Sequence, residues 1–95
     1  MRRLRYRFRL YVAGDAPNSL LAVANLAELC RSHLAGQPEV EVVDVLREPE
    51  VALADGILMT PTLIRLAPTP VLRIVGTLSQ SVIVLHALGL VSAAA

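Results

Sequence analysis

Apolar and polar positions alternate with different periods along the first half of the chain, and these periods predict three elements. In residues 5–12 the apolar positions recur at every second residue, which is the period of a strand whose two faces differ. Residues 20–34 predict a helix, with Asp15 or Asn18 as its cap. Residues 40–45 alternate again and are rich in valine, which predicts a second strand.

The second half of the chain predicts a short helix, a hairpin and a final helix. Helices or turns are predicted at 49–55 and 79–88, and strands at 63–66 and 71–75. Pro68 and Pro70 separate the two strands, because proline cannot continue a ladder of hydrogen bonds. Ser79 suits the start of the last helix and Gly89 its end. The β-branched run at 82–84 fits a strand equally well, so this segment is locally ambivalent.

The predicted elements follow the order β-α-β-α-β-β-α, which is that of a thioredoxin-like α/β sandwich. In that fold the first two strands are parallel and joined by a crossover helix, and the last two form an antiparallel hairpin. A chain of 95 residues has the size of one domain. We therefore expect a single domain over 1–95, with flexible ends at 1–4 and 92–95.

The composition excludes several classes of protein. Hydrophobic residues make up 55% of the chain, which is too many for a disordered protein. A net charge of +1 and few aromatic residues argue against binding to nucleic acid or to a membrane. No apolar run approaches the ~18 residues of a membrane span. The single cysteine excludes an internal disulfide, and the basic start lacks the apolar run of a signal peptide, so we expect a cytoplasmic protein.

All nine basic residues are arginines, and five of them fall in the first nine positions. These five are Arg2, Arg3, Arg5, Arg7 and Arg9. Four of them alternate with Leu4, Tyr6, Phe8 and Leu10, which places the apolar set on one face of the strand and the arginines on the other. Two interpretations follow: a basic ribbon that holds an acidic partner or a phosphate, or a solvated strand end that discourages edge aggregation.

The chain lacks the chemistry of a redox or metal enzyme. Thr60-Pro61-Thr62 resembles the loop that thioredoxin-like proteins hold against their redox disulfide, yet there is no Cys-x-x-Cys motif. Cys30 falls near the end of the first helix, where the negative pole disfavours a thiolate, so we expect a buried structural cysteine. His33 and His86 have no second metal ligand at useful spacing. With no P-loop or dinucleotide motif either, we expect no cofactor, and an enzyme is the weaker class.

Four segments carry a resemblance to a known family. They are Leu10-Tyr-Val-Ala-Gly-Asp-Ala-Pro-Asn-Ser19, Val43-Asp-Val-Leu-Arg-Glu-Pro49, Ile57-Leu-Met-Thr-Pro-Thr-Leu63 and Pro70-Val-Leu-Arg-Ile-Val-Gly76 with Leu78-Ser79. In this order and spacing they resemble the KaiB family, over nearly the whole chain. The resemblance implies a small non-enzymatic clock protein that binds the KaiC ring ATPase. In cyanobacteria such proteins also help to capture KaiA and to displace the sensor kinase SasA.

The resemblance also implies two folds for one sequence. One is a ground state, and the other is a thioredoxin-like state that binds KaiC after the C-terminal half has refolded. The residues expected to govern this balance are Thr60, Pro61, Thr62, Pro68, Pro70, Gly76, Ala87 and Gly89. We expect Pro61 to be cis. Alanine at 87 and glycine at 89 favour a helix with a natural stop, so we expect the thioredoxin-like state to dominate.

Contacts with partners are expected along the second strand and around the Thr-Pro-Thr segment. The candidate residues are Glu39, Val40, Glu41, Val42, Gly56 and Arg73. Clock-type members carry basic residues on the second strand, so the acids here argue against a KaiA-type contact. The edge of that strand still suits main-chain pairing with a partner. The first helix is apolar nearly all round, including Leu21, Ala24 and Ala27, which predicts either a self-association face or a harmless alanine surface.

The expected partner is therefore a KaiC-like ATPase or a sensor kinase, together with a possible second copy of the chain. Two other functions stay open. The first is a thiol or redox protein of thioredoxin descent that uses Cys30. The second is a homo-oligomeric adaptor with no role in a clock.

Overall fold

The computed structural model describes residues 5–90, which form seven elements in the predicted order. These are β1 (Arg7–Val12), α1 (Pro17–His33), β2 (Glu39–Asp44), α2 (Pro49–Ala54), β3 (Thr62–Ala67), β4 (Leu72–Val75) and α3 (Ser81–Ala87). The ambivalent C-terminal segment is helical. The ends that were predicted to be flexible, 1–4 and 92–95, lie outside the described residues.

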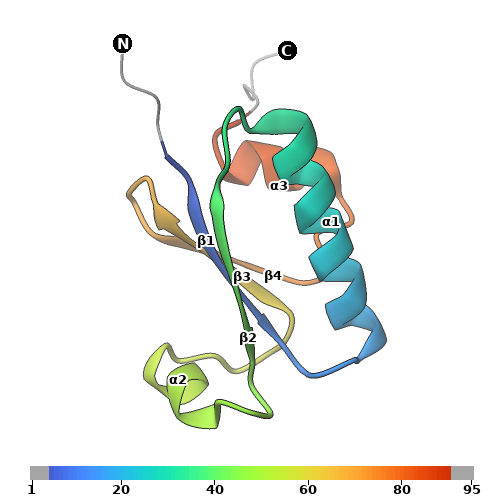
Figure 1. Ribbon diagram of the computed structural model, residues 1–95, viewed down its shortest axis with the longest axis vertical. Helices are drawn as coiled ribbons and strands as arrows, with labels where there is room; N and C mark the ends of the chain where they lie inside the picture. The colour runs from blue at the N-terminus through green and yellow to red at the C-terminus, as the bar shows by residue number, and fades with distance from the viewer. Residues whose placement is uncertain (1–4, 91–95) are drawn as a thin grey trace.

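The four strands form one sheet in the order β2-β1-β3-β4 (Figure 1). β1 runs parallel to β2 and antiparallel to β3, and β4 pairs antiparallel with β3. Helix α1 makes the connection between the two parallel strands, because such strands need a crossover. The arginine-bearing strand β1 is therefore central, and β2 and β4 are the edges of the sheet.

The two faces of the sheet carry separate apolar cores. On one face α1 and α3 cover Phe8, Leu10 and Leu63, all 1% exposed or less (Figure 1). On the other face the smaller helix α2 covers Tyr11 and Ile64. The alternation predicted for β1 is confirmed, since consecutive side chains of a strand point to opposite faces.

The starts of the two longer helices differ from the sequence prediction. Ala16 is the N-cap of α1 and Gln80 is that of α3, and neither makes a capping bond with its side chain. The predictions of Asp15 or Asn18, and of Ser79, as caps were therefore wrong. Helix α1 begins at Pro17, whose missing N–H costs nothing in the first turn.

Hydrogen bonds to other residues explain why the hydroxyl of Ser79 does not cap α3. The hydroxyl of Ser79 lies 2.6 Å from that of Thr77, and Asn25 of α1 donates to it over 3.3 Å. Asn25 also donates to the carbonyl of Thr77 over 2.8 Å. In this way a side chain of α1 fixes the segment before α3, and tertiary contact overrides the local capping preference.

The end of α3 confirms the prediction for Gly89. This glycine has φ +74°, a left-handed conformation that is cheap only for glycine. Its N–H donates to the carbonyl of His86 over 3.0 Å, and the N–H of Leu90 donates to that of Leu85 over 2.9 Å. These two bonds form the Schellman motif that satisfies the last carbonyls of a helix.

The peptide bond before Pro61 is cis, as predicted, and so are those before Pro68 and Pro70. The carbonyl of Pro61 accepts a hydrogen bond from Gly76 over 2.9 Å. The loop before β3 and the turn after β4 are thus joined at one end of the hairpin.

Candidate functional site

The arginines of β1 are bound by the acids of β2. The parallel register places Arg7 opposite Glu39 and Arg9 opposite Glu41. Arg7 Nε donates to the Glu39 carboxylate over 3.0 Å, and Arg9 Nε donates to that of Glu41 over 2.9 Å. The interpretation as a strand end that discourages edge aggregation was wrong, because β1 is central in the sheet. Within the chain the charges of Arg7 and Arg9 are paired with acids of β2. The pairs are partly exposed, so each contributes little to stability, but together they cancel the charge of the edge strand.

The outer edge of β2 has free main-chain groups. The N–H of Glu39 donates to the carbonyl of Tyr6, just before β1, over 3.0 Å, and the N–H of Val45 donates to the carbonyl of Val12 over 2.8 Å. In a parallel pair the bonded residues alternate, so the N–H groups of Val40 and Val42 point away from the sheet. Their side chains are 45% and 49% exposed. As predicted, β2 is therefore an edge strand, with main-chain N–H groups that point outward.

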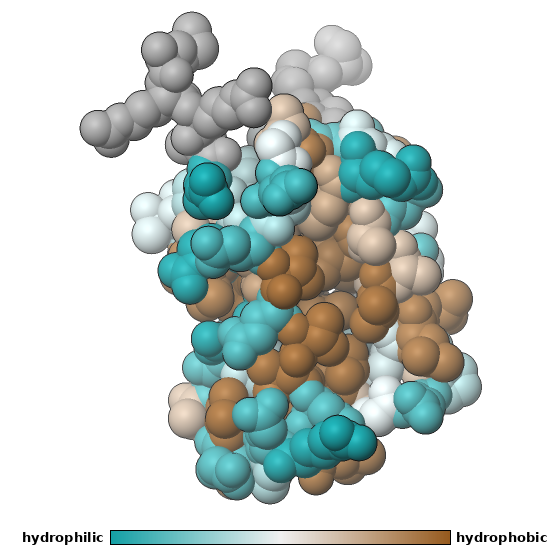
Figure 2. Space-filling model, viewed as in Figure 1, coloured by the Kyte–Doolittle hydropathy of each residue, from teal (hydrophilic) through white to brown (hydrophobic). Residues whose placement is uncertain are grey.

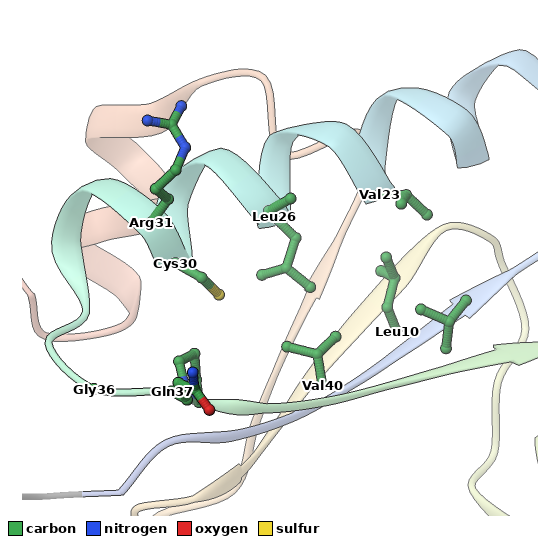
Figure 3. Close-up of a pocket in the computed structure, with 11 residues that line it drawn as sticks. Leu10, Val23, Leu26, Cys30, Arg31, Gly36, Gln37 and Val40 are labelled. Atoms are coloured by element: carbon green, nitrogen blue, oxygen red, sulfur yellow. The ribbon is translucent and has the colours of Figure 1, made fainter.

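An apolar groove runs between this edge and α1. It encloses about 390 Å³, and Val23, Leu26 and Cys30 of α1 point into the space on the side of Val40 (Figure 3). The space-filling view shows apolar residues gathered between β2 and α1 on this face (Figure 2). Arg31 lies at one end but turns away to an ion pair with Glu28. The groove can hold apolar side chains, and it offers little to a polar ligand.

Cys30 is only half-buried, where the sequence predicted a buried cysteine, because its side chain lines the groove; its surroundings still disfavour thiol chemistry. Burial raises the pKa of its thiol above the ordinary value, so the nucleophilic thiolate is scarcer than in a free cysteine. Among residues 5–90 no group of His, Cys, Asp or Glu side chains is arranged to hold a metal ion. Within the same range no helix is long and apolar enough to cross a membrane.

A second cluster of side chains fixes the end of α2 to the face of the sheet that α2 covers. The Asp55 carboxylate accepts hydrogen bonds from Arg9 Nη1, over 3.0 Å, and from the hydroxyl of Tyr11. Arg73 of β4 donates to the carbonyls of Asp55 and Gly56, the latter over 3.4 Å. We call these four residues, Arg9, Tyr11, Asp55 and Arg73, the clamp.

The clamp shifts the pKa values of its members. The hydrogen bond from Tyr11 is the main cause that lowers the pKa of Asp55, and Arg9 lowers it further. Burial, followed by the bond to Asp55, raises the pKa of Tyr11. The bond to Glu41 is the largest cause of a raised pKa for Arg9. The carboxylate is therefore held ionised and the phenol neutral, which is the arrangement of a structural tie.

The candidate partner residues fall into two groups. Glu39, Val40, Glu41 and Val42 share the edge strand, whereas Gly56 and Arg73 meet at the clamp. Arg9 links the two groups, because it donates both to Glu41 and to Asp55. The sequence did not predict the clamp, since Asp55 and Arg9 are 46 positions apart.

Arg65 was also missed. It is 6% exposed, and it donates to the carbonyl of Leu88 over 2.8 Å and to that of Pro70 over 2.9 Å. This buried guanidinium connects the end of α3 to the turn of the hairpin. Its Nε has no acceptor among the described residues. The sequence offered one signal that this arginine is buried: it is a single charge within the otherwise apolar run 63–66.

Comparison with known proteins identifies the sequence family. The model of the KaiB domain matches residues 9–90. The circadian clock oscillator protein KaiB of Prochlorococcus marinus, strain MIT 9313, is 45% identical over 75 residues. That match covers 79% of this chain and 63% of the relative, so the chain spans less than two thirds of its length.

Comparison with solved structures identifies the fold. The N-terminal domain of SasA from Synechococcus elongatus aligns with a TM-score of 0.69 and 18% identity, over 86% of this chain and 79% of that domain. The thioredoxin Deadhead of Drosophila melanogaster aligns with a TM-score of 0.70 and 16% identity, over 92% of this chain and 82% of that protein. The predicted thioredoxin-like fold is confirmed. Because the KaiB domain model matches residues 9–90, and because a KaiB protein is 45% identical over 79% of this chain, the chain belongs to the KaiB family.

Proposed function

We propose that this chain is a non-enzymatic clock or signalling protein that acts in the cytoplasm by docking to a partner. Its membership of the KaiB family supports a KaiC-like ring ATPase or a sensor kinase as that partner. The observation that carries the proposal is the open edge of β2, where outward main-chain N–H groups lie beside an apolar groove. A strand from the partner would pair with the edge and place alternate side chains in the groove.

The charge of this edge bears on which partners fit. Glu39 and Glu41 are neutralised by Arg7 and Arg9, so the edge presents little net charge. A partner strand is then selected by its apolar side chains. A contact of the KaiA type, which the basic residues of other family members favour, is not part of the proposal.

We propose further that docking takes place in the thioredoxin-like state and that this state dominates. Two observations support this. Ala87 lies within α3, where alanine is the best helix former, and Gly89 supplies the left-handed residue that ends the helix. The ground-state fold of the C-terminal half would then be a minor form.

The docking edge can be tested by removing one outward N–H. Val42→Pro deletes that donor but leaves the bonds from β2 to β1, and proline is tolerated on edge strands. Val42→Thr is the matched control, because it keeps the N–H and the β-branched shape. We expect the proline variant to bind a KaiC ring ATPase or a SasA-type kinase about tenfold more weakly. The loss of one main-chain hydrogen bond to the partner lowers the binding free energy by about 1.4 kcal/mol, which is a factor of about ten in Kd.

Circular dichroism and urea unfolding show whether both variants keep the native fold. If the two folded variants bind the partner equally well, β2 is not the docking edge. If the unmodified chain binds neither the ATPase nor the kinase, the assignment of the partner class is wrong.

A further inference from the structure

The sheet has a second open edge, at β4, on the side opposite β2 (Figure 1). The N–H of Gly76 donates to the carbonyl of Pro61 over 2.9 Å, and the register pairs Ile74 with Leu63. Bonded pairs alternate along an antiparallel ladder, so the main-chain groups of residues 73 and 75 point away from β3. Among residues 5–90 no other strand pairs with β4, so these groups are available to a further strand.

Two apolar hollows flank this edge, one on each face of the sheet. On the face that α3 covers, a hollow of about 380 Å³ lies between β4 and α3, and Ile74, Ile83 and Val84 line it. On the other face, Leu58 and Met59 line a hollow of about 220 Å³. The side chains of a strand paired with β4 would alternate between the two faces, so each hollow would receive every second side chain.

The charge of this edge differs from that of β2. All eight acidic residues lie at or before Asp55, so residues 56–90 carry two arginines and no carboxylate side chain. Arg65 is buried, which leaves Arg73 as the exposed arginine of the hairpin formed by β3 and β4. Within the described part of the chain its guanidinium forms no ion pair, and the nearby Asp55 carboxylate is already bound by Arg9. The edge of β4 is therefore basic, whereas the acids of β2 are neutralised.

The surroundings of this edge are fixed by hydrogen bonds. Arg73 donates to the main-chain carbonyls of Asp55 and Gly56, which holds its guanidinium beside the hollow under the loop that precedes β3. Arg65 joins the carbonyl of Leu88, at the end of α3, to that of Pro70 in the turn of the hairpin. Both hollows are thus bounded by anchored segments, so a ligand would cost little additional ordering.

We propose that the edge of β4 binds an extended acidic peptide segment of a partner protein. The segment pairs with β4 through its main chain, places a carboxylate beside Arg73, and places its next side chain, an apolar one, in the hollow against α3. A single exposed arginine between apolar hollows suits a peptide better than the phosphate chain of a nucleic acid. Because β2 lies at the other edge of the sheet, this site is separate from the proposed docking edge and does not depend on the partner named for it.

The probe for this site is a short blocked peptide in which valine alternates with glutamate. We expect it to bind with a Kd on the order of 0.1–1 mM, measured by NMR titration of the isotope-labelled chain. The amide signals of residues 71–76 should shift, whereas those of residues 39–44 should not. The same peptide with glutamine in place of glutamate should bind about tenfold more weakly. An absence of shifts at 71–76, or equal binding of the two peptides, would overturn the proposal.

Two matched pairs of variants locate the contact. Val75→Pro removes an outward N–H, whereas Val75→Thr keeps that N–H and the β-branched shape. Ile83→Ala shrinks the hollow against α3, whereas Val82→Ala changes a residue of the same helix that is equally exposed but does not line the hollow. We expect the glutamate peptide to bind about tenfold more weakly to the proline variant and about threefold more weakly to Ile83→Ala. If each control, folded by circular dichroism, loses as much binding as its partner, the contact surface is wrong.

The decisive experiment combines Arg73→Gln with the two peptides. Glutamine removes the charge but keeps an amide that can donate to main-chain carbonyls. The glutamate peptide should bind this variant about tenfold more weakly, whereas the glutamine peptide should bind both chains alike. Equal losses for the two peptides would mean that Arg73 acts only through the fold, which refutes its pairing with an acid. Val42→Pro at β2 should leave peptide binding unchanged, so the failure of either docking edge can be told from that of the other.

Discussion

The clamp makes a quantitative prediction for Tyr11→Phe. The Tyr11 side chain is fully buried, and its hydroxyl donates to the Asp55 carboxylate. A hydrogen bond to a charged group contributes about 1.5–3 kcal/mol. Asp55 keeps its bond from Arg9 in the variant, and its side chain is 31% exposed, so water replaces part of the loss. We therefore expect Tyr11→Phe to lower the free energy of unfolding by about 1–2 kcal/mol.

Urea unfolding followed by circular dichroism measures this difference. With a urea dependence of about 1 kcal/mol per M, the midpoint should fall by about 1–2 M at neutral pH. Tyr6→Phe is the matched control, because it removes the same hydroxyl from a ring that stacks on Phe8 at 5.9 Å. That hydroxyl makes no hydrogen bond with the described residues, so the control should change stability by less than about 0.5 kcal/mol.

The difference should also depend on pH. Because the folded pKa of Asp55 lies below its ordinary value of 3.8, the stabilisation is complete above that value. It is lost as the pH falls through the lower folded pKa. The gap between the native chain and Tyr11→Phe should therefore narrow in acid below pH 3.8. A gap at neutral pH no larger than that of Tyr6→Phe, or one that does not change in acid, would refute the role assigned to this bond.

Four further predictions concern Tyr11 at high pH, the end of α3 and Cys30. The raised pKa of Tyr11 means that stability is lost as the pH rises above its ordinary value of 10.0, so urea midpoints should fall there for the native chain and less for Tyr11→Phe. Gly89→Ala should lower the free energy of unfolding by about 1–2 kcal/mol, because a side chain at φ +74° is strained although no atom crowds it; an unchanged thermal midpoint would contradict this. Cys30→Ala, which removes the thiol and keeps the groove apolar, should leave partner binding nearly unchanged, whereas lost binding would revive the thiol interpretation. Ala87→Gly combined with Gly89→Asp should raise the population of the alternative fold, seen as reduced helical NMR shifts at 79–88; identical spectra would count against the proposed balance.

The site was only partly visible in the sequence. The candidate residues on β2 came from the family resemblance, and the apolar surface of α1 came from its local pattern. The structure places Val40 and Val42 of β2 and Ala27 of α1 in one groove. The ion pair of Arg7 with Glu39 was not predicted, because it depends on the register of two strands that are 32 positions apart. The same applies to Asp55, whose partners come from β1. Such pairs depend on distant segments that meet only after folding.

The order of the seven elements, the end of α3 at Gly89 and the family could all be predicted from the sequence. Each of these rests on short-range information, namely the period of apolar residues, the conformational freedom of glycine and local motifs. The central position of β1 and the pairing of its arginines with the acids of β2 became clear only from the folded structure. The start of α3 is likewise set by a distant side chain, because Asn25 of α1 fixes the segment before it. The physical reason is that strand order and side-chain partners are set by packing between segments remote in sequence, where local preferences of about 1 kcal/mol are easily overridden.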